Sequence, residues 1–286
     1  MSSSSVPSVA AIVLAYQPDD DIVRNVELLG EQAAHVYIVN NSSDAPSTAL
    51  LARFTDDDGV TVLEQSGNVG VAAGFNAGMR AALAEGYDFV WIFDQDSTVT
   101  VGMLSRMLAA HRALGPVAGV IAPALRSHAT GRIYRRESGV GAADLDVVIS
   151  SGSLFSRGLI ERIGMHDEPL FIDYVDHDIC LRARRYGFRN QKVFDAVLDH
   201  RFGDSVSATL LGRRVYLSNY SPLRQYYMAR NRMILIKRFG FGRWFWEDLA
   251  FTSKAWVKVL LRENDRRVKV AAFFRGWLDG VRYPTR

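Results

Sequence analysis

The stretch Val90-Trp91-Ile92-Phe93-Asp94-Gln95-Asp96 joins four apolar residues to two carboxylates one residue apart. A short apolar run that ends in charge is typical of a buried parallel strand, and the carboxyl ends of such strands form the edge where open α/β sheets bind substrates. Asp94 and Asp96 can then share one hard cation, because carboxylate oxygens suit Mg²⁺ or Mn²⁺ and leave room for substrate phosphates. The alternative is a plain Asp/Ser turn that caps a helix near Val101.

Composition indicates a globular protein of the reducing cytoplasm. The chain has 286 residues, of which 48% are hydrophobic and 23% charged, enough for one large domain or for a domain with an appendage. Its single cysteine, Cys180, excludes an internal disulfide, and its first residues have neither the basic start nor the apolar run of a signal peptide. We therefore expect a cytoplasmic location.

Short apolar runs alternate with segments of helical length in the first half of the sequence, as in stacked β-α units. Polar residues follow each run. Because the carboxyl ends of parallel strands meet at one edge of a sheet, we expect a site at that edge. The predicted strands are residues 9–15, 36–39, 60–63 and 90–93, and the polar segments that follow them are 16–18, 40–44, 67–70 and 94–96.

A glycine-rich segment, Gly67-Asn68-Val69-Gly70-Val71-Ala72-Ala73-Gly74-Phe75-Asn76-Ala77-Gly78, separates the third and fourth predicted strands. Glycines at a strand-to-helix turn let backbone N–H groups approach a phosphate at the positive end of the helix. The segment is not a dinucleotide fingerprint, because it does not follow the first strand and its spacing differs. For Gly74 and Gly78, close packing of the helix is an equally good explanation.

Four motifs in this order resemble the family 2 glycosyltransferases, and the likeness covers roughly residues 8–240. The bacterial rhamnosyltransferases of polysaccharide and O-antigen assembly are the most similar members. Many members have Glu-Asp ahead of the catalytic helix, where this chain has Val175-Asp176. The motifs are Asn40-Asn41-Ser42-Ser43-Asp44, the glycine-rich segment, Asp94-Gln95-Asp96, and Phe171-Ile172-Asp173-Tyr174-Val175-Asp176-His177-Asp178-Ile179-Cys180-Leu181-Arg182.

The resemblance implies an α/β protein with the GT-A fold, in which helices flank a mostly parallel central sheet and a helical extension follows. We expect a flexible tail at residues 1–7, a catalytic domain at 8–215 and basic, aromatic-rich helices at 216–286. The implied reaction is inverting and metal-dependent: L-rhamnose passes from dTDP-L-rhamnose to a glycan or polyprenyl-linked glycan of a cell-surface polysaccharide. A UDP-sugar donor such as UDP-galactofuranose is one alternative, and a non-catalytic nucleotide-sugar-binding protein is another.

Most of the expected site residues come from the four motifs. The others are Tyr16 and Gln17 after the first predicted strand, Ser151 and Gly152 in a small, polar turn, and two later positions that the resemblance marks, His200 and Arg230. A neutral imidazole is a suitable further ligand for Mn²⁺, although a histidine satisfied in the core is the alternative for His200. Near the acceptor we expect Ser151, Gly152, Asp173 and His177, and around Mg²⁺ or Mn²⁺ we expect Asp94, Asp96 and His200. Around the donor we expect Tyr16, Gln17, Asn40, Asn41, Asp44, Gly67, Asn68, Gly70, Gly74, Asn76, Asp94, Gln95 and Arg230.

Sugar transfer also requires a base for the proton of the attacking hydroxyl, and three carboxylates compete for this role. Asp178 lies four residues before Arg182, the spacing of a helical ion pair, so we predict a structural role for it. A carboxylate in the first turn of a helix is held ionised by the backbone dipole. Asp176 is therefore the predicted base, and Asp173, which shares its face if the helix has begun, is the second choice.

The last part of the chain is strongly basic. Residues 210–286 carry 17 Lys/Arg and 5 Asp/Glu, a net charge of +12, whereas residues 1–209 carry a net charge of −9. A helix is predicted over residues 222–239, and aromatic residues then alternate with Lys and Arg, without an apolar stretch long enough to span a bilayer. This pattern suits peripheral attachment to the inner face of an anionic membrane, with helix packing in a homodimer as the alternative. A nucleic acid partner is not expected, because these aromatic residues are placed for packing or lipid.

Overall fold

The computed structural model describes residues 7–54, 59–127, 131–133, 137–201, 206–210, 213–217, 219–263 and 265–284. The chain divides into two compact units. The first comprises Met1–Phe171 and Val175–Arg201, and the second comprises Ile172–Tyr174 and Phe202–Arg286. Except for Pro7, the tail expected at residues 1–7 lies outside the described residues.

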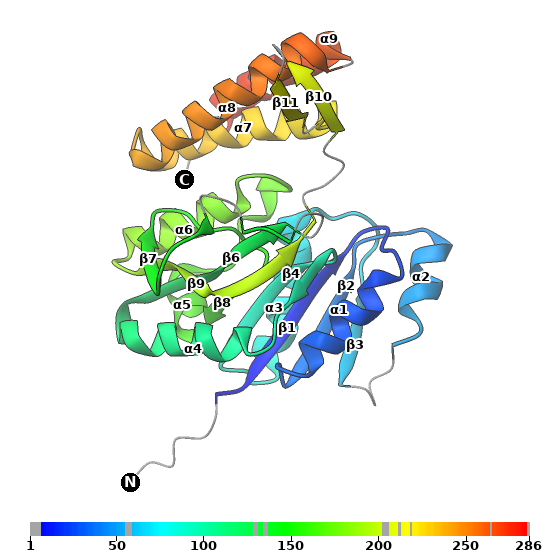
Figure 1. Ribbon diagram of the computed structural model, residues 1–286, viewed down its shortest axis with the longest axis vertical. Coiled ribbons are helices and arrows are strands. Elements are labelled where there is room, and N and C mark those ends of the chain that lie inside the picture. Colours follow the sequence, from blue (N-terminus) through cyan, green and yellow to red (C-terminus); the bar gives the residue numbers. More distant parts are fainter. Residues whose placement is uncertain are drawn as a thin grey trace. The chain divides into compact units, whose positions relative to one another are not determined.

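The first unit has a central sheet between two layers of helices, so the expected α/β class is confirmed (Figure 1). Its strands are β1 (Val9–Ala15), β2 (His35–Asn40), β3 (Val60–Glu64), β4 (Phe89–Asp94), β5 (Ser97–Val99), β6 (Ala118–Ser127), β7 (Ala142–Leu145), β8 (Ser153–Ser156) and β9 (Arg189–His200). Its helices are α1 (Asp21–Gly30), α2 (Ala45–Leu51), α3 (Val71–Ala84), α4 (Met103–Leu114), α5 (Arg157–Ile163) and α6 (Val175–Arg185), with short 3₁₀ turns η2 (Gly115–Val117) and η4 (Glu168–Leu170).

The sheet is built around β4, the strand that ends in Asp94. β4 pairs in parallel with β1, β1 with β2, and β2 with β3. Beyond β4 the directions are mixed: β8 is antiparallel to β4 and β6, whereas β6 and β9 are parallel, and the order is β3-β2-β1-β4-β8-β6-β9-β5 with β7 beside β9. Over β1–β4 the sheet is wholly parallel, as expected, and beyond β4 it is mixed, with β6 and β9 again parallel. Parallel neighbouring strands need a crossover connection, usually a helix. In the described residues no helix separates β6, β7 and β8, so these strands cannot continue the parallel pattern.

Alternate residues of β1 face opposite sides of the sheet and hold two separate cores. The odd-numbered residues from Val9 to Ala15 pack with α1, α2 and α4. The even-numbered residues from Ala10 to Leu14 pack with α3, α5 and α6. Helices on both faces leave only the strand ends accessible, so the loops after β1, β2 and β4 are where a substrate can reach this sheet.

The second unit consists of a hairpin and three helices. These are β10 (Val206–Leu210), antiparallel to β11 (Arg213–Leu217), and α7 (Pro222–Phe239), α8 (Arg243–Arg262) and α9 (Arg266–Arg282). Pro222 occupies the first turn of α7 as expected, and Ser221 caps that helix by accepting a hydrogen bond from the Arg224 N–H. A Cβ on Gly276 would lie 2.1 Å from the Tyr226 carbonyl oxygen, so glycine allows α9 to approach α7 closely. Among the described helices, none is both long and apolar enough to span a bilayer.

Candidate active site

Two carboxylates and one imidazole meet at the carboxyl end of β4. Asp94 is the last residue of β4, and Asp96 lies in the turn that leads into β5. Antiparallel pairing of β5 with β9 sets Ser97 opposite His200, which brings the imidazole beside Asp96. One ligand atom from each of Asp94, Asp96 and His200 lies within 4.8 Å of the others. The three residues expected to hold a metal are therefore neighbours in the fold.

This cluster fits a hard divalent cation. Asp96 Oδ1 is buried and has no hydrogen-bond partner among the described residues, and His200 Nδ1 lies 3.7 Å from it. Burial raises the pKa of Asp96, while the neighbouring His200 acts in the opposite direction. A buried carboxylate oxygen of this kind gains a partner when a cation binds. Two carboxylates and an imidazole are a ligand set that Mg²⁺ and especially Mn²⁺ accept.

Two buried serines connect the members of the cluster. Ser97 Oγ lies 2.9 Å from His200 Nδ1 and 2.7 Å from Ser151 Oγ. The Asp94 backbone N–H donates to Ser151 Oγ at 3.2 Å. Ser97 was not among the residues expected at the site, although its position directly after Asp96 was an available signal. Ser151, expected beside the acceptor, is fully buried and supports the carboxylate cluster, and its contact with an acceptor stays a prediction.

Gly152, the other small residue expected near the acceptor, closes the turn before β8 against β4. Its N–H donates to the Ile92 carbonyl at 2.7 Å, and its carbonyl accepts from Trp91 Nε1 at 2.8 Å. Its φ of 79° and the nearness of Pro123, 2.7 Å from where a Cβ would stand, both require glycine. Gly152 is buried in this packing role, and its contact with an acceptor stays a prediction.

Gln95, between the two carboxylates, ties the loop after β4 to the loop after β1. Its amide oxygen accepts from the Tyr16 N–H at 2.6 Å, and its amide nitrogen donates to the Tyr16 carbonyl at 3.0 Å. The next residue, Gln17, has a φ of 48° and donates its N–H to Ser42 Oγ at 2.7 Å in the loop after β2. The structure therefore brings together the three loops that were expected to line a nucleotide pocket.

Asn40 and Asn41 brace these loops from inside. Asn40 Nδ2 donates to Glu64 at 2.8 Å, and its Oδ1 accepts from the Ser42 N–H at 3.1 Å. Asn41 Oδ1 accepts from the Val69 N–H at 2.8 Å. Both side chains are almost fully buried, so they hold the loop backbone in shape. Direct contact of either side chain with a donor stays a prediction.

Asp44 and Asn68 make local hydrogen bonds to the backbone in the same loops. Asp44 caps α2: it accepts from both the N–H and the hydroxyl of Ser47 in the first turn of that helix, and these bonds lower the pKa of Asp44. Asn68 Oδ1 accepts from the Gly70 N–H at 3.0 Å. Gly67 and Gly70 have φ values of 135° and 88°, which favour glycine at both positions. Hydrogen bonding of Asp44 to a nucleobase stays a prediction.

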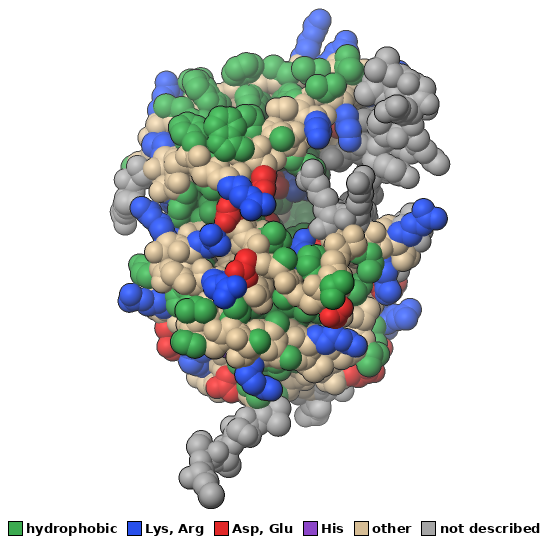
Figure 2. Space-filling view, turned by 60° about the vertical axis from the view of Figure 1, so that its left-hand side comes forward, with side chains coloured by type: hydrophobic (Ala, Val, Ile, Leu, Met, Phe, Trp, Pro, Cys, Tyr) green, Lys and Arg blue, Asp and Glu red, His purple; other side chains and the backbone are tan. Residues whose placement is uncertain are grey.

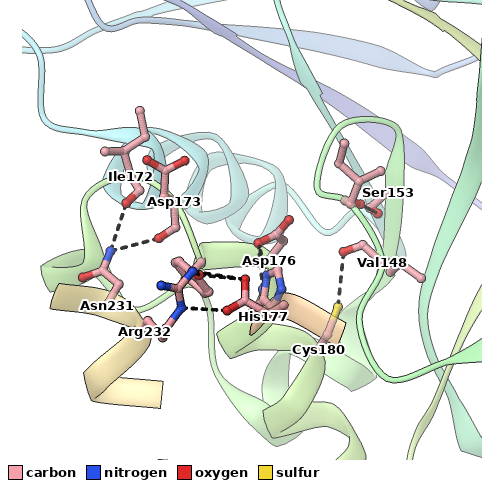
Figure 3. A network of polar contacts seen from close by, with 12 residues as sticks. Val148, Ser153, Ile172, Asp173, Asp176, His177, Cys180, Asn231 and Arg232 are labelled. Carbon is pink, nitrogen blue, oxygen red and sulfur yellow. Dashed lines mark hydrogen bonds and ion pairs between the residues drawn. The ribbon is translucent and has the colours of Figure 1, made fainter. Parts of the chain in front are cut away.

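Asp176 is the second residue of α6, in the first turn as expected. Burial favours its neutral form, but His177 outweighs burial and lowers the pKa of Asp176. His177 donates its backbone N–H at 2.8 Å, and its Nδ1 lies 2.9 Å from the same Asp176 oxygen (Figure 3). About a quarter of each side chain is exposed. An ionised, partly accessible carboxylate is the state that a general base requires.

Comparison with known proteins places these features in a family. Residues 10–169, more than half of the chain, match the model of glycosyl transferase family 2. The chain belongs to this family. It is 28% identical over 244 residues to the dTDP-rhamnosyl transferase RfbF of Shigella flexneri, covering 81% of this chain and 80% of that protein. It is 27% identical to the galactofuranosyltransferase GlfT1 of Mycobacterium tuberculosis, covering 92% and 96% respectively.

The fold is also that of solved glycosyltransferases. The mannosyltransferase PcManGT from Pyrobaculum calidifontis, solved with GDP-Man and Mn²⁺, superimposes on 99% of this chain and 77% of its own with a TM-score of 0.61 at 16% identity. The expected GT-A fold is therefore confirmed.

The glycine-rich segment of this family 2 chain is mainly a packing element. The N–H groups of Val71 and Ala72, at the start of α3, both donate to the Phe171 carbonyl. A Cβ on Gly74 would lie 2.3 Å from Leu14, and Asn76, which is 3% exposed, is bonded to the backbone of His166. Gly74 and Asn76 thus have structural roles, and their contact with a donor stays a prediction. A phosphate at the start of α3 would have to displace the Phe171 carbonyl.

Asp178 has the structural role predicted for it. It is fully buried and binds Arg182 Nε at 2.7 Å, and Arg182 also donates to two backbone carbonyls, those of Ile163 and Met165. Cys180 on the same helix is buried among apolar residues, as a small hydrophobe.

Asp173, the second choice as base, belongs to the second unit and precedes α6, so it does not share a helical face with Asp176. Its carboxylate is paired with Arg224, one bond being 3.2 Å long. Asn231, fully buried, donates its amide to the carbonyls of Ile172 and Asp173, each at 2.9 Å (Figure 3). These bonds hold an unusual backbone, in which Asp173 has a φ of 62°.

Tyr174 also has a positive φ, of 65°. We call the bonds that hold the backbone of residues 172–174 the polar clamp, and Tyr174 contributes through its hydroxyl. Its hydroxyl donates to Asp248 at 2.8 Å and accepts from Arg232, which itself binds Asp248 at 2.7 Å. Arg230 instead lies over the rings of Tyr227 and Tyr283, 5.7 Å and 5.1 Å from their centroids. The expected contact of Arg230 with a diphosphate stays a prediction.

Proposed function

We propose that this chain is an inverting rhamnosyltransferase that moves L-rhamnose from dTDP-L-rhamnose to a glycan or polyprenyl-linked glycan acceptor in bacterial cell-surface polysaccharide synthesis. The donor assignment rests on the likeness to the dTDP-rhamnosyl transferase RfbF, which extends over four fifths of both chains. Galactofuranose from a UDP donor is the second candidate, because the likeness to GlfT1 is of similar identity and covers more of the chain.

Asp94, Asp96 and His200 are the proposed ligands of a divalent cation. One ligand atom from each residue lies close to the other two, and Asp96 Oδ1 is buried without a hydrogen-bond partner among the described residues. A cation held there supplies positive charge to the departing diphosphate. Mn²⁺ accompanies GDP-Man in the mannosyltransferase of the same fold, and Mg²⁺ suits the same oxygen ligands.

Asp176 is the proposed base. The acceptor oxygen bonds to the anomeric carbon as the bond from that carbon to the diphosphate oxygen breaks, and the electron pair leaves with the diphosphate. The proton of the acceptor hydroxyl passes to the Asp176 carboxylate, which His177 keeps ionised. Because attack comes from the side opposite the leaving group, the product has the inverted anomeric configuration.

The remaining site residues serve as supports in this proposal. Gln95 and Tyr16 fix the loops around the nucleotide, and Ser97 orients the His200 ring. His177 stands next to the base and on the acceptor side. Residues 216–286 bring the enzyme to the cytoplasmic face of a membrane, where a polyprenyl-linked acceptor would be presented, and homodimer packing is the alternative use of these helices.

A donor panel tests the proposal. The purified chain is incubated with dTDP-L-rhamnose, UDP-galactofuranose and other nucleotide sugars, with Mn²⁺ or Mg²⁺ and with EDTA, and release of the nucleoside diphosphate is measured. Metal-dependent turnover is expected with dTDP-L-rhamnose. Turnover with UDP-galactofuranose alone would replace the donor assignment, and tight donor binding without turnover of any donor would favour a non-catalytic binding protein.

A further inference from the structure

Helix α8 carries apolar residues on two sides. Its inner side, which includes Trp244 and Val259, is buried. A second set is exposed, and at about 100° per residue its members, apart from the exposed Phe251 on another side, lie within about 60° of Trp246 around the helix. This outer stripe consists of Trp246, Leu249, Val257, Leu260 and Leu261. A surface helix normally turns one apolar stripe to the core, so the outer stripe indicates a partner.

Helix α9 repeats the arrangement. Phe274, Trp277, Leu278 and Val281 are all exposed, and the same angular reasoning places them within about 60° of Phe274. Figure 2 shows hydrophobic side chains gathered over the C-terminal helices with Lys and Arg around them. The two exposed tryptophans suit a boundary between water and lipid, because indole has an apolar body and one N–H donor.

The charges that border the stripes are mostly positive. Exposed cations on the two helices include Arg243, Lys254, Arg267, Arg275 and Arg282. Glu247 and Asp265 are exposed acids of this region, and Glu247 pairs with Arg243 at 2.7 Å, whereas the other three acids are turned inward within the second unit.

These three acids have partners: Asp248 binds Arg232, Glu263 binds the buried Lys269, and Asp279 accepts from the Tyr226 hydroxyl. The outer surface of these helices is therefore more basic than their sequence alone indicates.

We infer that the outer stripes of α8 and α9 lie in the headgroup region of an anionic membrane, with Trp246 and Trp277 inserted and the bordering cations on lipid phosphates. The inference rests on the membrane attachment in the proposed function and adds which surface makes that attachment. It does not depend on which nucleotide sugar is the donor. Charge decides against a second copy of the chain as the occupant, because two copies would bring like charges together across the contact.

The test uses the full chain and sedimentation with vesicles of phosphatidylcholine alone or of equal parts phosphatidylcholine and phosphatidylglycerol. Binding is expected only to the anionic vesicles and should weaken as salt is raised. The double variant Trp246→Ser, Leu260→Ser should bind at least about tenfold more weakly, since it removes two apolar side chains that the membrane would bury. Lys254→Glu with Arg267→Glu should remove the preference for anionic lipid.

Leu223→Ser is the matched control, because Leu223 is an exposed leucine of the same unit on α7, outside both stripes. It should bind as the unchanged chain does. The inference would be overturned if the Trp246→Ser, Leu260→Ser variant bound anionic vesicles as well as the unchanged chain does. A dimer in lipid-free buffer that this variant abolishes would also overturn it, in favour of a second copy of the chain on the stripes. Hydrolysis of dTDP-L-rhamnose, measured in the same samples, separates the membrane inference from the proposed function. If the chain binds anionic vesicles but does not turn over this donor, only the rhamnosyltransferase assignment is contradicted.

Discussion

Replacing Asp176 with Asn removes the proposed base while preserving its surroundings. The Asn carbonyl oxygen can still accept the His177 N–H, now 2.8 Å from the carboxylate, and the side chain is of the same size. Only one charge-assisted contact with the His177 ring is changed. We therefore expect the free energy of unfolding to fall by no more than about 1–2 kcal/mol.

Transfer, in contrast, should fall sharply. Positioned proton transfer contributes about 10²–10⁴-fold in rate, or about 2.7–5.4 kcal/mol of barrier. Donor affinity, measured by calorimetry, should stay within about threefold, because the base is assigned to the acceptor hydroxyl, so the loss should be in kcat. The pH profile adds a second readout. The pKa of Asp176 is lowered, so kcat should decline only as pH falls below the usual range of an aspartate, and this acid limb should vanish in Asp176→Asn.

Two neighbouring carboxylates serve as controls. Asp178→Asn leaves Arg182 without its buried partner and should cost about 3–5 kcal/mol of stability, visible in urea unfolding, in place of a selective loss of kcat. If Asp173→Asn abolishes transfer while Asp176→Asn remains active, the base is misassigned. A product that retains the anomeric configuration of the donor would refute the single-displacement mechanism altogether.

Three further outcomes are expected. Asp96→Asn should weaken Mn²⁺ binding, followed by electron paramagnetic resonance, by at least about a hundredfold, and unchanged binding would exclude the cluster as the metal site. Ser97→Ala should weaken Mn²⁺ binding by about ten- to a hundredfold through loss of the contact to His200, with little change in the free energy of unfolding. An effect on stability alone would show that Ser97 has no part in metal binding. Gly78→Ala would place a Cβ 2.4 Å from Ile12, so overpacking should outweigh the gain in helix propensity. The unfolding free energy, measured by denaturant titration, should fall by about 1–2 kcal/mol. A stabilised variant would contradict the close packing of α3 on β1.

Features that depend on local patterns were predictable from the sequence. The strands β1–β4 and the helix α7 lie where apolar runs and Pro222 placed them. The ion pair between Asp178 and Arg182 followed from helical spacing alone. The pairing of Asp94 with Asp96 followed from the local pattern, but His200 could be added to them only through family likeness, since it lies 106 residues from Asp94 along the chain.

What local patterns could not predict are the partners that polar side chains find across the fold. Ser97 and Ser151 are 54 residues apart, and only the strand pairings bring them together. Asn76 meets His166 across 90 residues, so the asparagine that was expected at the donor is used in the core. Asp173 was placed on a helical face with Asp176, but its positive φ lies outside the helix, and the bonds that hold it there come from Arg224 and Asn231.

The polar clamp on residues 172–174 also sets an order of events during synthesis. Asp173 leaves the ribosome 51 residues before Arg224, and Tyr174 leaves 74 residues before Asp248. The strands of the first unit are complete at His200, well before either partner is available. A left-handed backbone is costly without such partners, so this segment, directly ahead of the helix with Asp176, acquires its shape only when α7 and α8 have emerged. A nascent chain released before that point would have a finished sheet and an unformed entrance to α6.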